Sequence, residues 1–216
     1  MSNEQPARPV LRVGFVRGVT LTKWRTIWQE RFPRVPLEVQ EVPQAEQRTV
    51  LDQGEVDLCF ARLPLDTDEL HLIRLYDEVP VVWAAKDHAV AAVEDVGLED
   101  LADEDCLTEV TAHAIDLVAI GEAVLLVPMS VARSQSRRDL VYRPIRDAEP
   151  TTVGLAWKVD NPNELIAEFI GIVRGRTANS SRTTRERGAA APKKPAKAPK
   201  SAPPSPRGRS RGRRTR

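Results

Sequence analysis

Residues 11–61 read LRVGFVRGVTLTKWRTIWQERFPRVPLEVQEVPQAEQRTVLDQGEVDLCFA, and this stretch decides the fold. Leu11–Val16 and Val56–Ala61 are short apolar runs typical of buried strands. Between them, Thr20–Arg31 places apolar side chains at helical spacing, and Leu37–Val42 alternates as a half-buried strand does. Strands separated by helices predict parallel pairing through βαβ crossovers.

Strand and helix signals continue to alternate along the chain as far as residue 176. The further expected elements are strands at Val79–Ala85, Ala123–Val127, Leu140–Arg143 and Val153–Trp157 and helices at Ala45–Gln53, Thr111–Ile120 and Pro162–Arg176. We expect Thr20 and Asn161 to cap the first and the last of the helices, and Pro128 to open a further one. The pattern predicts an α/β fold.

The near-neutral net charge of +1 hides two oppositely charged parts. Arg182–Arg216 contains 13 of the 32 basic residues and one of the 31 acids, so this segment carries +12. The remaining 19 bases and 30 acids give the rest of the chain a charge of −11. From Thr177 onward the sequence contains no Leu, Ile, Val, Phe, Tyr or Trp, which predicts a disordered tail because such a segment cannot bury apolar surface.

Several classes of protein are excluded by what the sequence does not contain. It has no apolar run of about 18 residues for a membrane span, and MSNEQPARP is not a secretory signal. Cys59 and Cys106 lack a CxxC context, so we expect two small buried thiols, no zinc and a reducing cytoplasm. His113 has no partner in a catalytic motif, and we therefore expect neither an enzyme nor a cofactor.

The sequence resembles the effector-binding domain of LysR-type regulators in several segments. LRVGFV, TLTKWRTIWQERFP, LEVQEV and QGEVDLCFARLP follow the order of the first lobe of that domain. EVPVVWAAKDHAVA is similar to the strand that crosses between its lobes, and AIDLVAIGEAVLLVPMSVAR to a segment of its second lobe. The segments GVT, KW and IGIVRGRTANSSR resemble those of an actinobacterial subgroup that carries a basic tail and no DNA-binding domain.

The resemblance implies a two-lobed domain of the type 2 periplasmic-binding-protein-like fold, with parallel-sheet βαβ units. The expected boundaries are 1–10 for an N-terminal extension, 11–176 for the domain, about 11–84 and 150–176 for lobe 1, about 85–149 for lobe 2, and 177–216 for a disordered basic tail.

Two departures from the family pattern affect what we expect. Only ten residues precede Leu11, which is too few for the winged helix-turn-helix of a LysR regulator. The family places a further strand–helix unit in its second lobe. The sequence near Asp105-Cys106 is too short to hold it, because a complete βαβ unit needs about 30 residues. We therefore expect a shortened second lobe.

In the family that the sequence resembles, a carboxylate effector binds between the lobes, at the carboxyl ends of strands. The corresponding positions here are Arg17, Thr20, Gln44, Arg62 and Met129. Arg17 would supply charge and Thr20 a hydroxyl group, while Gln44 would be a polar contact at the start of the second helix. A guanidinium such as that of Arg62 clamps a carboxylate bidentately. Met129 would be an apolar contact from the second lobe.

Four of these five residues also have a purely structural interpretation. Thr20 is equally typical of an ordinary N-cap, and Gln44 of a solvated loop. Arg62 could form a surface ion pair with Asp66 or Asp68. Met129 could simply fill the core.

The tail is the strongest chemical signal, because its cations are separated by Pro and Ala, which keep a chain open. The expected contacts with phosphates are Lys193, Lys194, Lys197, Lys200, Arg207, Arg209, Arg211, Arg213, Arg214 and Arg216. The tail has no aromatic residue for base stacking, so we expect nucleic-acid contact without base readout. A solubilising tail, or one that folds back on the acidic domain, is the alternative.

These features predict a cytoplasmic accessory transcriptional regulator or sensor that binds a small organic anion and makes non-specific DNA contact through its tail. A homodimer and association with the nucleoid are compatible with this prediction. The alternative is an interaction protein whose shortened domain no longer binds a ligand.

Overall fold

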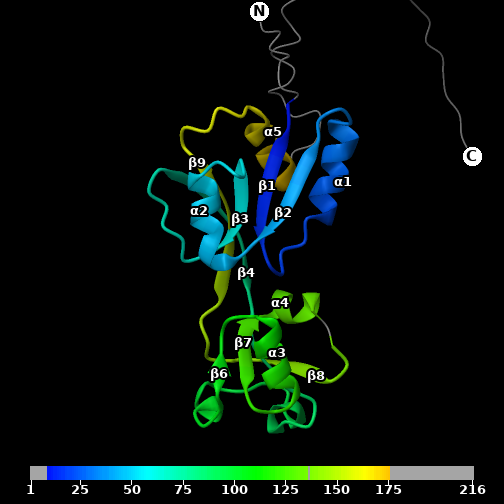
Figure 1. The fold of residues 1–216 in the computed structure, drawn as a ribbon, viewed down its shortest axis with the longest axis vertical. Helices are drawn as coiled ribbons and strands as arrows, with labels where there is room; N and C mark the ends of the chain where they lie inside the picture. Colours follow the sequence, from blue (N-terminus) through cyan, green and yellow to red (C-terminus); the bar gives the residue numbers. More distant parts are fainter. Residues whose placement is uncertain (1–8, 136, 176–216) are drawn as a thin grey trace, which may run out of the picture. The chain divides into compact units, whose positions relative to one another are not determined.

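The computed structural model describes residues 9–135 and 137–175. The chain divides into two units, Met1–Ala178 and Asn179–Arg216. The basic tail and all ten of its expected phosphate contacts lie outside the described residues. No helix within the described part is long and apolar enough to cross a membrane. This part contains two mixed β-sheets, each with helices packed against it (Figure 1).

The first sheet has the strand order β2-β1-β3-β9-β4. Its strands are β1 (Leu11–Val16), β2 (Leu37–Val42), β3 (Leu58–Arg62), β4 (Leu70–Glu78) and β9 (Thr151–Lys158). Its helices are α1 (Thr22–Arg31), a 3-10 turn at Gln44–Glu46, α2 (Gln47–Asp52) and α5 (Leu165–Val173). β1 pairs in parallel with both β2 and β3, which confirms the predicted βαβ units. β9 runs antiparallel between β3 and β4 and makes the sheet mixed.

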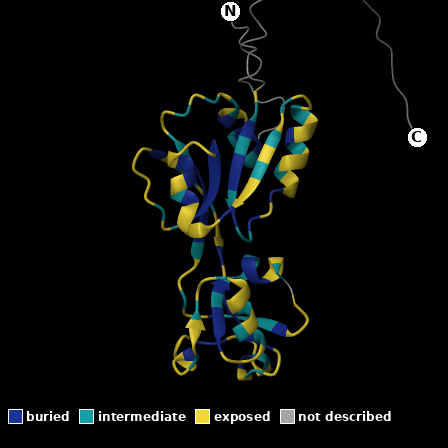
Figure 2. Ribbon diagram, in the orientation of Figure 1, coloured by how far each residue is buried: buried dark blue, intermediate teal, exposed yellow. Residues whose placement is uncertain are grey.

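Strand β3 is buried on both faces of the first sheet, so its sequence is continuously apolar rather than alternating. On one face, Phe60 stacks on Trp24 of α1 with ring centroids 4.7 Å apart, and its edge meets Phe169 of α5. On the other face, Cys59 packs in the cluster that contains Leu51 of α2. Figure 2 shows the central strand β3 buried along its length and its neighbour β1 mostly buried, in contrast to the edge strand β2.

The second sheet has the strand order β6-β7-β5-β8. Its strands are β5 (Pro80–Ala85), β6 (Cys106–Leu107), β7 (Val124–Pro128) and β8 (Leu140–Pro144), and its helices are α3 (Ala112–Ala119), α4 (Met129–Ser134) and 3-10 turns at Ala89–Ala92 and Glu99–Leu101. Trp83 packs with α3 and α4 in one apolar cluster, and Val82 with Val90 and Leu101 in another. The short β6 lies where we expected a strand and helix to be missing, and the lobe still has a core on both faces of its sheet.

The structure changes several expected boundaries. β5 belongs to the second sheet, so the chain crosses between the lobes at Val79 instead of near residue 85, because β5 hydrogen-bonds to β7 and β8. Thr20 is not the N-cap of α1, which begins at Thr22 after Leu21. Pro128 ends β7 and is the N-cap of α4.

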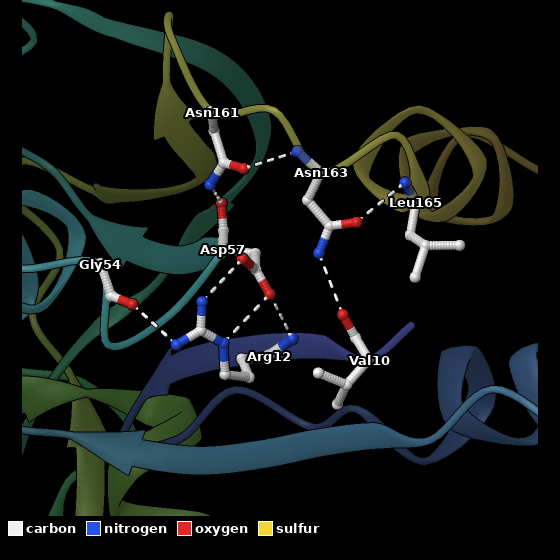
Figure 3. Close-up of polar contacts among 7 residues, drawn as sticks. All are labelled: Val10, Arg12, Gly54, Asp57, Asn161, Asn163 and Leu165. Atoms are coloured by element: carbon white, nitrogen blue, oxygen red, sulfur yellow. Dashed lines mark hydrogen bonds and ion pairs between the residues drawn. The ribbon is translucent and has the colours of Figure 1, made fainter. Parts of the chain in front are cut away.

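Asp57 ties together the starts of β1, β3 and α5 (Figure 3). Its buried carboxylate accepts hydrogen bonds from the backbone N–H of Arg12 at 2.7 Å and from Nη2 of the same residue at 3.0 Å. Its carbonyl oxygen accepts a bond from Asn161 Nδ2. Asn161 was expected to cap α5, but the N-cap residue is Glu164, which makes no side-chain capping bond, while Asn163 Oδ1 accepts from the N–H of Leu165 at the start of the helix. Asn161 instead connects this turn to β3.

We expect Asp57→Ala to lower the free energy of unfolding by about 2 kcal/mol, because hydrogen bonds to a charged group are lost while the exposed Arg12 side chain regains water. Urea unfolding followed by tryptophan fluorescence measures the change. Asp52→Ala is the matched control, since Asp52 forms a surface pair with Arg48. An equal loss in both variants would contradict the role of Asp57.

Candidate functional site

Arg62 lies at the centre of a buried polar cluster where the carboxyl ends of β1 and β3 meet. It is the last residue of β3 and is 4% exposed. Its guanidinium donates from Nε to Glu78 Oε2 at 2.7 Å, from Nη1 to Gln44 Oε1 at 3.2 Å and from Nη2 to the carbonyl of Arg17 at 3.0 Å. The described residues therefore accept from three of the five N–H groups of a guanidinium.

Gln47 on α2 holds the backbone of Arg62 in place. Its side-chain oxygen accepts from the N–H of Arg62 at 2.9 Å, and its Nε2 donates to the carbonyl of Arg62 at 2.8 Å. Because Gln47 is itself buried, the pair satisfies two backbone groups that water cannot reach. Arg62 is thus held at its backbone and at its guanidinium.

Glu78 connects this cluster to the second lobe. It is the last residue of β4, it is 5% exposed, and its second carboxylate oxygen accepts a hydrogen bond from Ser130 Oγ in the first turn of α4. The carboxylate therefore has both a cation and a hydroxyl group as partners, as a buried charge requires. Glu78 also affects Tyr76, whose pKa is raised by burial and by the charge of Glu78.

The loop after β1 approaches the second lobe closely. Gly18 has a φ of +95°, and a Cβ atom at this position would lie 2.5 Å from Ser130 Oγ and 3.0 Å from the backbone nitrogen of Val131. The Arg17 guanidinium donates to Glu41 Oε1 at 2.8 Å and to the carbonyl of Val110 at 3.0 Å. Two separate contacts thus join this loop to the second lobe.

A further polar atom lies beside Glu78 and lacks a partner. Thr151 Oγ1 is buried and has no hydrogen bond to any residue that the structure describes. Thr151 is directly opposite Glu78 in the antiparallel pairing of β4 and β9, so the two side chains point to the same face. In the next pair along the strands, Thr152 Oγ1 donates to Asp77 Oδ1 on the other face of the sheet.

The structure brings together some of the five residues predicted from the sequence. Arg62 and Gln44 bond to each other, and Arg17 contributes its carbonyl oxygen, while its guanidinium bonds elsewhere. Thr20 is exposed. Met129 is half-buried, packs on the apolar cluster around Trp83 and donates its N–H to the carbonyl of Val79.

Sequence reasoning missed Glu78 and Ser130. The partners considered for Arg62 were Asp66 and Asp68, which are closer in sequence, but the guanidinium pairs with Glu78 because β4 returns beside β9 to the same end of the sheet. A signal was present in the sequence, since Glu78 is an acid placed immediately before the apolar crossing strand.

Other reactive side chains of the described part do not form a metal site. Residues 9–135 and 137–175 contain no group of three or more His, Cys, Asp or Glu side chains that could hold a metal ion. His113 is exposed on α3. Cys59 is buried, which raises its pKa to about 12. Cys106 is exposed, so the expectation of two buried thiols is wrong for this residue, which lies on a two-residue edge strand.

Known proteins are similar to this chain in sequence and in fold. The model of the LysR substrate binding domain family matches residues 4–113. The HTH-type transcriptional regulator AlsR of Bacillus subtilis (strain 168) is 26% identical over 197 residues, which cover 76% of this chain and 65% of AlsR. The chain therefore spans about two thirds of the length of that relative.

Solved structures share the fold. The effector binding domain of a BenM variant has a TM-score of 0.67 and 23% identity, covering 76% of this chain and 93% of that one. The BenM effector binding domain with its effector benzoate has a TM-score of 0.66 and 21% identity, covering 85% of this chain and 96% of that one. At such identity the likeness shows the two-lobed fold alone.

We expect Gly18→Ala to lower the free energy of unfolding by about 3 kcal/mol, because the new Cβ atom adds a clash with Ser130 to the strain of a positive φ. Gly121→Ala is the control, since Gly121 has a φ of +79° and nothing within 4 Å of the added atom. This control should lose only about 1 kcal/mol. Equal losses by urea unfolding would refute the close contact between the lobes.

Proposed function

This chain belongs to the LysR substrate binding domain family, a domain of transcription regulators and not an enzyme, and we propose that it senses a small organic anion bound between its lobes. The observation that carries the proposal is the position of Arg62. Its guanidinium lies at the carboxyl ends of strands, where open α/β sheets bind ligands, and it contacts both β4 and the loop after β1.

The similar BenM domain has benzoate as its effector, which is a small organic anion. In this chain a carboxylate would bind at the N–H groups of Arg62 that Glu78, Gln44 and Arg17 do not use. Gln44 would contact the ligand from the exposed side, because it is the exposed member of the cluster. Arg17, Thr20 and Met129 would border the site.

Binding there would change the relation of the lobes, because the same cluster joins them. Glu78 bonds to Arg62 in the first lobe and to Ser130 in the second. A ligand carboxylate on the free N–H groups of Arg62 would weaken the attraction between Arg62 and Glu78 and hence change the bond of Glu78 to α4. A ligand that binds one arrangement of the lobes more tightly than another shifts the equilibrium between the two arrangements. A dimer interface or a partner surface would transmit the change.

The basic tail would hold this cytoplasmic sensor near DNA by neutralising phosphates, as an accessory regulator associated with the nucleoid. The 13 cations of Arg182–Arg216 favour this role over specific readout. A second candidate function is that of an interaction protein whose domain binds no ligand. The buried pairing of Arg62 with Glu78 favours it, since the guanidinium already has an internal carboxylate partner.

We expect small organic carboxylates, tested with and without an amino group, to include ligands that raise the Tm of the full chain with concentration. Binding to the folded state alone stabilises it by about 2.7 kcal/mol when the ligand exceeds Kd a hundredfold. Gln44→Ala should weaken the response by removing a contact, whereas Gln40→Ala on the exposed face of β2 should not. If no compound shifts Tm, the sensor function is wrong and the interaction protein is favoured.

We expect the full chain to bind duplex DNA weakly and a Met1–Ser181 truncation not to bind. Titrations by fluorescence anisotropy between roughly 50 and 200 mM salt should show a steep loss of affinity, because counterions are released. A chain with a scrambled tail of identical composition should bind equally well. Binding by the truncation would place the DNA contact in the acidic domain instead.

A further inference from the structure

The candidate site contains one buried cation and one buried anion, and its charges therefore balance. Arg62 and Glu78 are 4% and 5% exposed and their charged atoms lie 2.7 Å apart. The other polar side chains around them, Gln44, Ser130 and Thr151, are neutral. The nearby guanidinium of Arg17 bonds to Glu41 and does not add charge to this cluster.

A simple monoanion does not suit a site with this balance. If its carboxylate binds to Arg62, two carboxylates share one guanidinium and one negative charge remains without a partner. Burying an uncompensated charge is strongly unfavourable. A ligand that brings a positive charge together with its carboxylate leaves every buried charge paired, because its cation becomes the partner of Glu78.

We infer that the effector is a zwitterion of the amino-acid class, with its carboxylate on Arg62 and its ammonium group on Glu78. This inference rests on the proposed function, because it names the chemical class of the ligand of the same site. Glu78 is then the residue that determines specificity. It accepts ligands with a cationic group and disfavours the corresponding simple acids.

The neutral groups near Glu78 match an ammonium ion. Such an ion has three N–H donors, and it needs acceptors for all of them when buried. Glu78 supplies one acceptor, the hydroxyl oxygen of Ser130 lies against the same carboxylate, and Thr151 Oγ1 is a buried hydroxyl on the same face without a partner among the described residues. A ligand ammonium group gives that orphan atom the hydrogen bond that it lacks.

The first test compares ligands on the unmodified full chain. The probes are α-, β- and γ-amino acids, each paired with the carboxylic acid of the same skeleton without the amino group. Tm shifts identify binders and calorimetry gives their Kd values. We expect the best amino acid to bind at least about tenfold more tightly than its paired acid, because the acid leaves Glu78 or itself without a charge partner.

The second test neutralises Glu78 and keeps its shape. In Glu78→Gln, Arg62 becomes an unpaired cation, so we expect the amino-acid preference to fall at least about tenfold and the simple acids to gain affinity. Asp77→Asn is the matched control, because it removes the same charge one residue away, from a side chain that is 65% exposed and lies on the opposite face. The control should keep the preference of the unmodified chain.

The outcomes separate this inference from the proposed function. If simple acids bind the unmodified chain as tightly as amino acids do, or if Glu78→Gln folds and leaves the preference unchanged, the zwitterion inference is wrong and the sensor function stands. If neither class binds, both are wrong. The comparison of amino acids with simple acids on the unmodified chain tests the zwitterion inference even if Glu78→Gln loses its cooperative unfolding transition.

Discussion

The buried ion pair between Arg62 and Glu78 is the interaction on which the rest of the structure depends. It joins the end of β3 to the end of β4 and, through Ser130, joins the first lobe to α4 of the second. Removing one partner from such a pair leaves an uncompensated buried charge, so replacing either side chain alone destabilises the protein. The lobes are therefore linked by a polar contact that a charged ligand can contest.

The architecture of the first lobe holds this pair in place from the opposite end. At the start of β1, Arg12 and Asp57 tie that strand to the turn before β3. At its end, the carbonyl of Arg17 accepts from Arg62, so the same two strands are connected by polar contacts at both ends. Between them, β3 is buried on both faces by apolar packing. The guanidinium thus projects from a rigid strand, which is how a binding group is kept in position.

The chemistry of the site follows from its charge balance more than from the presence of an arginine. An exposed arginine would attract any organic anion, whereas Arg62 is already paired with Glu78. A ligand must offer a cation as well as a carboxylate in order to leave every buried charge paired. The orphan hydroxyl of Thr151 and the hydroxyl of Ser130 extend the site toward the crossing strands. Recognition and the link between the lobes therefore use the same residues.

The sequence by itself determined the elements of the first lobe, its βαβ units and the family, because apolar periodicity and turn residues are local properties. It also placed Gln44 and Arg62 near each other, since the carboxyl ends of parallel strands meet at one edge of a sheet. Only the tertiary structure decided that Glu78 pairs with Arg62, that Thr20 stays exposed and that β9 returns antiparallel between β3 and β4. The physical reason is that pairing of buried charges depends on distances in space, and these are set by how distant strands pack.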